Sequence, residues 1–73
     1  MSIERESTGV YDKNGKEIFS ADILSLDYET IHMEGEVIKK DGEWVLFQDK
    51  HNFVGVEHNK DRVSVIGNAY PEN

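Results

Sequence analysis

Acidic side chains are the residues of this sequence whose number and spacing could do chemistry. No Lys or Arg occurs between Lys16 and Lys39, whereas this interval contains Glu17, Asp22, Asp27, Glu29, Glu34 and Glu36. Such a run could supply a general acid and a general base, or it could create a region of strong negative potential on the folded surface. Because so short a chain leaves little room for a substrate cleft, we expect the second.

A negative surface region has two interpretations. A solvated face that keeps a small protein soluble would explain the acids. A docking surface for another protein with a basic surface, such as one that normally holds nucleic acid, would also explain them. For the docking surface the candidate partner-binding residues are four acids and two aromatics expected to stay partly exposed, namely Asp27, Tyr28, Glu29, Glu34, Glu36 and Trp44.

Other catalytic and metal-binding patterns fail on spacing. Counted from Asp12, Gly15 falls at position 4 of a calcium loop and Ile23 at position 12, where the loop requires glycine at 6 and an acid at 12. The three histidines have no cysteine to complete a zinc site. The serines lack the glycines of a nucleophile elbow, and no glycine-rich phosphate loop is present. We therefore expect no catalytic residue, no metal, no cofactor and no enzymatic activity.

Composition bounds the class of protein. A chain of 73 residues is expected to form a single domain over residues 1–73, with 1–7 as a flexible or edge segment. Fifteen acids against eight bases give a formal net charge of −7, which disfavours direct binding to nucleic acid or to an anionic membrane. The absence of cysteine and of an apolar N-terminal run favours the cytoplasm over secretion.

Short alternating runs rich in β-branched and aromatic residues predict strands at 8–11, 17–20, 22–28, 33–39, 43–48, 52–57 and 62–66. Asn14-Gly15 and Asp41-Gly42 predict two-residue hairpin turns with positive φ at both positions. Residues 58–61 predict a third turn, and Pro71 marks the end of the last strand. The fold class is therefore all-β, a small single-domain barrel of about five or six short antiparallel strands.

The core is expected from the same alternation. Residues 44–47 are apolar on both faces, which predicts a central strand covered on both sides. Gly35, Gly55 and Gly67 interrupt strand-like runs and predict bulges or bends.

The two ends of the chain carry a pair of motifs. The first reads Thr8-Gly9, Asp12-Lys13-Asn14-Gly15-Lys16-Glu17-Ile18 and Asp22-Ile23; the second reads Ile66-Gly67-Asn68 and Tyr70-Pro71-Glu72-Asn73. Together they resemble the YopX-like family of small phage and prophage proteins. The sequence departs from the family pattern at Ala21 and Ala69, where the family usually has Gly and Ile.

The resemblance implies a β-barrel-like domain, for which an SH3-like barrel is one candidate, made in the cytoplasm of a bacterial host. It implies structural roles for Asp12, Asn14, Gly15, Asp22, Gly67 and Asn68. It names no reaction. Two functional classes stay open: a phage-encoded accessory protein that binds, and inhibits, a host defence or nucleic-acid enzyme, and a barrel that sequesters a small ligand or nucleotide through Lys39, Lys40 or Arg62.

Self-association is a further expectation. An open barrel leaves strand edges, and the segments 52–57 and 8–11 carry few charges that would prevent edge-to-edge pairing. We therefore expect a symmetric homodimer.

Overall fold

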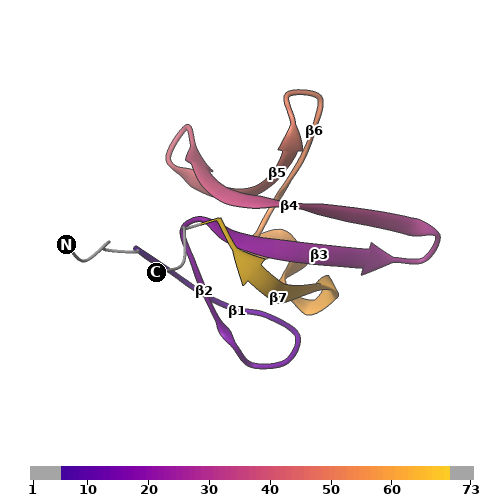
Figure 1. The fold of residues 1–73 in the computed structure, drawn as a ribbon, viewed down its shortest axis with the longest axis horizontal. Coiled ribbons are helices and arrows are strands. Elements are labelled where there is room, and N and C mark those ends of the chain that lie inside the picture. The colour runs from indigo at the N-terminus through magenta and orange to yellow at the C-terminus, as the bar shows by residue number, and fades with distance from the viewer. Residues whose placement is uncertain (1–5, 70–73) are drawn as a thin grey trace.

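The structure of this chain, a computed structural model, describes residues 6–69. These residues form seven strands and one 3-10 helix (Figure 1). In chain order the elements are β1 (Ser7–Tyr11), β2 (Glu17–Phe19), β3 (Asp22–Tyr28), β4 (Ile31–Lys40), β5 (Glu43–Asp49), β6 (Asn52–Gly55), η1 (Glu57–Arg62) and β7 (Val63–Asn68). All strand pairs are antiparallel, so the predicted all-β class is confirmed.

The strands form two sheets. β1 and β2 make a two-stranded hairpin, and the other five strands follow the order β6-β5-β4-β3-β7. Within residues 6–69 the larger sheet stays open and does not close into a barrel. The connection through η1 carries the chain from the β6 edge to the opposite edge at β7. The predicted hairpin turn at 58–61 is thus corrected to a helical crossover, and the strand predicted to reach residue 57 ends at Gly55.

β4 holds the sheet together. Its first half pairs with β3 and its second half with β5, and Glu36 lies opposite both Ile23 and Phe47. Figure 1 shows β4 running beside β3 and then turning upward with β5. Gly35 allows this change of partner, because a Cβ at that position would lie 2.4 Å from the backbone oxygen of Phe47.

The two predicted tight turns differ. Asp41 and Gly42 have φ of 53° and 83°, and they join the paired residues Lys40 and Glu43. This two-residue turn confirms the prediction. At Asn14-Gly15 only the glycine has positive φ, at 81°.

The first hairpin therefore has a longer loop than predicted. The N–H of Gly15 donates to the carbonyl of Asp12, and the N–H of Asp12 donates to the carbonyl of Lys16. A turn followed by a glycine with positive φ is the usual geometry of a three-residue hairpin loop. The extra residue is accommodated because the Asp12 side chain accepts hydrogen bonds from inside the loop.

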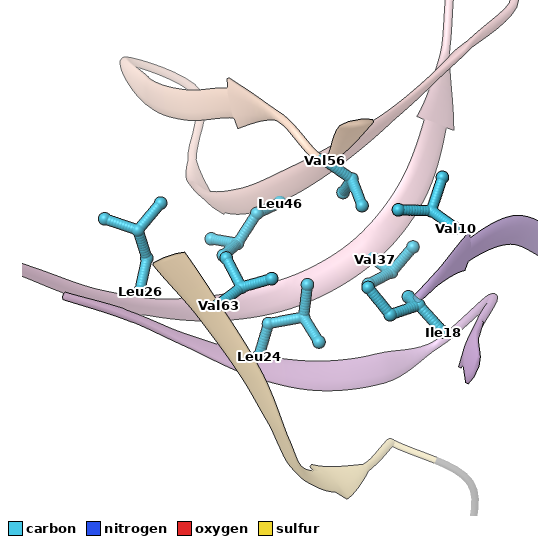
Figure 2. Packing of buried hydrophobic residues seen from close by; sticks show 8 residues of the cluster. All are labelled: Val10, Ile18, Leu24, Leu26, Val37, Leu46, Val56 and Val63. Atoms are coloured by element: carbon cyan, nitrogen blue, oxygen red, sulfur yellow. The ribbon is translucent and has the colours of Figure 1, made fainter. Parts of the chain in front are cut away.

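The core lies between the larger sheet and the β1–β2 hairpin (Figure 2). Leu24 and Val37 from β3 and β4 meet Ile18 from β2 and Val56 from the start of the crossover. Leu46 of β5 is fully buried among them, but Trp44 and Phe47 are only half-buried. The expectation of a central strand covered on both faces is confirmed in part. β5 lies between β4 and β6, and Val45 and Leu46, which point to opposite faces, are both buried, whereas Trp44 and Phe47 are not.

The remaining sequence expectations concern the chain ends. Residues 1–5 of the predicted N-terminal segment, and Tyr70 and Pro71 of the closing segment, lie outside the described residues. Ser7 already belongs to β1, where its hydroxyl donates to the Glu17 carboxylate.

Candidate functional site

The face of the larger sheet that points away from the core carries the acidic residues. Opposite residues in an antiparallel pair share a face, and successive residues alternate between faces. Asp27 pairs with His32, and Glu34 and Glu36 follow on β4 with the same parity. Leu24 and Leu26 have the opposite parity and belong to the core. We call the surface formed by Asp27, His32, Glu34, Glu36, Phe47 and Phe53 the outer face.

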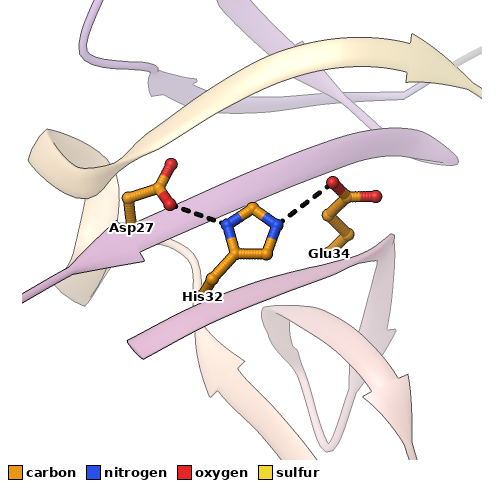
Figure 3. Close-up of polar contacts among 3 residues, drawn as sticks. All are labelled: Asp27, His32 and Glu34. Carbon is orange, nitrogen blue, oxygen red and sulfur yellow. Dashed lines mark hydrogen bonds and ion pairs between the residues drawn. The ribbon is translucent and has the colours of Figure 1, made fainter. Parts of the chain in front are cut away.

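His32 bridges two carboxylates on the outer face (Figure 3). Its Nδ1 lies 2.7 Å from an Asp27 oxygen, and its Nε2 lies 3.2 Å from a Glu34 oxygen. All three side chains are more than half exposed. A protonated imidazole can donate from both nitrogens at once, so this geometry fits the charged form of the ring.

The electrostatics of the cluster follow from this contact. The hydrogen bond to Asp27, and then the one to Glu34, raise the pKa of His32 above its usual value. The hydrogen bond from His32 lowers the pKa of Asp27. Proton loss from His32 as the pH rises would therefore increase the negative potential of the outer face.

Two aromatic rings adjoin the acidic part of the outer face. Phe47 lies opposite Glu36, and Phe53 lies opposite Phe47 on the next strand. Their ring centroids are 6.3 Å apart with planes inclined by 18°, and Lys40 Nζ lies 5.4 Å from the Phe53 ring centroid. The Phe53 residue is 40% exposed. The outer face thus combines carboxylates with an exposed aromatic surface.

The structure separates the predicted partner-binding residues into two groups. Asp27, Glu34 and Glu36 lie together on the outer face. Glu29 lies beyond them in the β3–β4 turn, with φ of 57°. Tyr28 and Trp44 have the opposite strand parity and do not join this surface.

Both excluded aromatics have basic neighbours on their own face. The Arg62 guanidinium carbon lies 4.0 Å from the centroid of the Tyr28 ring, and Lys39 Nζ lies 5.3 Å from that of the Trp44 ring. Trp44 also packs against the core. Two bases considered for anion binding, Arg62 and Lys39, are therefore already engaged with aromatic rings.

Sequence reasoning missed His32, Phe47 and Phe53 as members of this surface. A partial signal for His32 was available, because His32 has the same parity as Glu34 and Glu36 and immediately precedes the strand predicted at 33–39. The contact with Asp27 was not available, because it depends on the β3–β4 register. The aromatic pair depends likewise on the β5–β6 register.

Asp12 joins the hairpin loop to β7. Its Oδ1 accepts from the N–H groups of Asn14 and Lys16, both at 2.8 Å, and its Oδ2 accepts from the N–H of Val65 at 2.9 Å. Burial alone would raise the pKa of the carboxyl, but these backbone donors and the Lys16 charge outweigh burial and lower it. The neighbouring N–H of Lys13 donates to the carbonyl of Val63.

The other motif residues of the chain ends meet at the β3–β7 pair. Asp22 is buried, accepts from the N–H of Phe19 at 2.8 Å, and lies opposite Asn68. Gly67 lies opposite Ile23, next to a bulge in β7. These residues join the start of β3 to the end of β7, and none of them belongs to the acidic cluster of the outer face.

A groove of about 700 Å³ opens on the other side of the molecule, between β1, β5, β6 and η1. Trp44 and Val54 line it from the sheet, Val10 from β1, and Glu57 and His58 from the helix. None of the residues lining it is Lys or Arg. The groove therefore has the aromatic side chain expected for a ligand-sequestering barrel but lacks the basic residue expected to bind an anion.

Two further features are absent from residues 6–69. No group of three or more His, Asp or Glu side chains there has an arrangement suited to holding a metal ion. The same part of the chain contains no helix that is long and apolar enough to cross a membrane.

Comparison with known proteins gives one match. A family model described as "YopX protein" matches residues 3–73. The search of curated proteins and the search of solved structures gave no match.

Proposed function

From the premise that the chain belongs to the YopX family, we propose that it is a phage-encoded accessory protein that acts by binding another protein. The outer face docks on a basic surface of a host or phage protein in the bacterial cytoplasm. Inhibition of a host defence or nucleic-acid enzyme would follow where that basic surface normally holds nucleic acid. The role is recognition and involves no catalysis.

One observation carries this proposal. The β3–β4 register collects Asp27, Glu34 and Glu36 on one face and places an aromatic pair beside them. Exposed carboxylates steer a basic partner toward a surface and speed association. Exposed aromatic rings supply contact area that becomes buried in the complex. Solubility alone would require the charges but not the adjoining rings.

A small-ligand or nucleotide site is the weaker alternative. The groove beside Trp44 is large enough for a small molecule. However, a phosphate group would meet Glu43 and Glu57 there and no lining Lys or Arg. Anionic ligands are therefore disfavoured at this groove.

The test compares two charge reversals that change the net charge equally. Asp27 and Glu34 are both replaced by Lys in one variant, and the exposed Glu6 and Asp61 in the control. Tagged wild-type protein and both variants are used to capture partners from a bacterial lysate. We then measure the association rate of the captured protein at several salt concentrations.

The proposal expects wild type and control to capture the same protein, with a rate that falls as salt rises. It expects the Asp27/Glu34 variant to associate about tenfold more slowly at low salt. Equal rates for the two variants would show that the outer-face carboxylates serve solubility alone.

A further inference from the structure

The open edge of β6 and the groove beside it form a second candidate binding surface. β6 is the last strand of the larger sheet and pairs only with β5 among the strands of residues 6–69. An unpaired edge exposes backbone groups that can accept another strand. The ladder between β5 and β6 fixes the direction of these groups.

The N–H of Val56 donates to the carbonyl of Trp44 at 3.1 Å, so these two residues form a hydrogen-bonded pair. Such pairs alternate along an antiparallel ladder, so Val54 is the next residue of β6 that bonds to β5. The backbone groups of Phe53 and Gly55 therefore point away from β5. Consistent with this, the carbonyl of Gly55 accepts from the Asn59 side chain at 2.8 Å.

This leaves the N–H and C=O of Phe53 and the N–H of Gly55 directed toward the edge. The edges of β1 and β7 differ. In β1 the N–H groups of Gly9 and Val10 are bonded to side-chain oxygens of the same strand. In β7 the N–H of Val65 is bonded to the Asp12 side chain. The β6 edge is therefore better suited to pairing with another chain than either of these two.

The groove continues from this edge. Val54 and Gly55 line it, and the half-buried Trp44 contributes an aromatic surface. Side chains of an added strand would alternate between the groove side and the outer face. Those on the groove side would lie near Val54 and Trp44, which can bury an apolar side chain. Those of opposite parity would lie beside Phe53.

Charge selects the occupant. Glu43, Glu57 and His58 line the groove, no Lys or Arg lines it, and Lys39 Nζ lies 5.3 Å from the centroid of the Trp44 ring. An extended segment with basic side chains complements these acids, whereas an acidic segment would be repelled. A second copy of this chain is disfavoured, because pairing two β6 edges would bring both pairs of acids together on chains that each carry a net charge of −7.

We propose that the β6 edge binds an extended basic segment of a partner protein by strand addition, with an apolar side chain entering the groove at Trp44 and basic side chains on the same face lying near Glu43 and Glu57. This inference rests on the proposed function, since it names how the partner's chain is held, but it uses a different surface from the acidic cluster. Specificity would come from alternate side chains and affinity from the backbone of Phe53.

The test uses two synthetic five-residue peptides, Lys-Ser-Val-Ser-Lys (the lysine peptide) and Glu-Ser-Val-Ser-Glu (the glutamate peptide), in which the charged side chains share one face with the valine. Trp44 is the single tryptophan of the chain, so its fluorescence reports groove binding directly. Amide shifts of Phe53 and Gly55 in NMR spectra report pairing at the edge. We expect saturable changes with the lysine peptide and none with the glutamate peptide.

Variants at the edge isolate the backbone contribution. Phe53→Pro removes an N–H that points away from β5, so the ladder is retained, and Phe53→Ala removes the ring but keeps the N–H. We expect Phe53→Pro to weaken lysine-peptide binding about tenfold and Phe53→Ala about twofold. Glu57→Gln should weaken it about two- to threefold. Circular dichroism of each variant checks that the sheet is intact.

Three results would overturn the inference: equal binding of the two peptides, unchanged binding by a folded Phe53→Pro variant, or concentration-dependent shifts of Phe53 and Gly55 in a sedimenting dimer without peptide. The last result would mean that the edge pairs with a second copy. If the Asp27/Glu34 reversal abolishes partner capture while no peptide binds, the inference fails and the outer-face proposal stands. If the lysine peptide binds as predicted and the Asp27/Glu34 charge reversal has no effect on partner capture, the strand-addition inference stands and the outer-face proposal fails.

Discussion

Asp12 and Asp27 show how one residue type serves two purposes in a single small protein. Asp12 is 7% exposed, and its oxygens accept from three backbone N–H groups, one of them 53 residues away at Val65. The Asp27 side chain is 57% exposed and contacts the side chain of His32. The first carboxylate fixes the backbone, whereas the second remains available to a partner.

The two aspartates differ in the groups that donate hydrogen bonds to their carboxylates. Backbone N–H groups around Asp12 are held by the fold and would lose their acceptor if the carboxylate were removed. The imidazole beside Asp27 is exposed to water, which can replace the lost contact at little cost. Burial and the identity of the donor therefore decide whether a carboxylate is structural or free for recognition.

The largest expected effect tests this comparison directly. Asp12→Ala should destabilise the protein by about 3 kcal/mol, because three part-buried N–H groups lose a charged acceptor. Asp27→Ala should leave the unfolding midpoint unchanged. Urea denaturation of both variants measures the difference, and equal midpoints would show that the buried position of Asp12 contributes nothing special.

The second prediction concerns what positions the outer face. Glu34 and Glu36 flank Gly35, whose close approach to the Phe47 backbone leaves no room for a Cβ. Gly35→Ala should destabilise the protein by about 2 kcal/mol through forced displacement of β4 or β5. Gly67→Ala is the control, because a Cβ there meets nothing within 4 Å. If the two variants have the same melting temperature, the close packing of the Gly35 backbone is not what positions the Glu34 and Glu36 carboxylates.

The third prediction concerns backbone strain at Ala21, in the turn between β2 and β3. Ala21 has φ of 66°, with its N–H bonded to the Val37 carbonyl and its C=O bonded to the N–H of Ala69. Because a Cβ is unfavourable at this φ, Ala21→Gly should stabilise the protein by about 1 kcal/mol. Ala69→Gly is the control, because it has no such strain to relieve and should not stabilise the protein. A melting temperature for Ala21→Gly at or below that of wild type would contradict the expectation.

The fourth prediction uses acid to separate the two aspartates. The folded-state pKa of Asp12 is lowered below 3.8. Its stabilising contribution is therefore fully present above the unfolded pKa and is lost as pH falls through the folded pKa. Asp12→Asn should be less stable than wild type at neutral pH and should lose less stability between about pH 5 and 2. Parallel acid-denaturation curves for the two proteins would refute this assignment.

The smallest expected effect concerns His32. Its folded-state pKa is raised above 6.5 by Asp27 and Glu34. Its contribution is therefore present below about pH 6.5 and is lost as pH rises through the folded pKa. NMR titration of the ring should give a pKa above 6.5 in wild type and a lower one in Asp27→Asn. A pKa that is the same in both proteins would mean that the contact in Figure 3 does not persist in solution.

The sequence by itself determined much of the local structure. Alternation predicted the all-β class, and Asp41-Gly42 predicted its hairpin because aspartate and glycine tolerate positive φ. The absence of Lys and Arg between residues 16 and 39 predicted a negative surface region, and Asp27, Glu34 and Glu36 do share a face. These features depend on neighbours in sequence or on one strand pair, so local patterns suffice to infer them.

Only the tertiary structure decided which of these residues meet. Tyr28 and Trp44 were grouped with the acids from composition, but strand parity places them on the opposite face. His32 joins Asp27 because of the β3–β4 register, and Asp12 reaches Val65 because η1 carries β7 back to β3. Register and crossover depend on the packing of the whole core, and no local pattern contains that information.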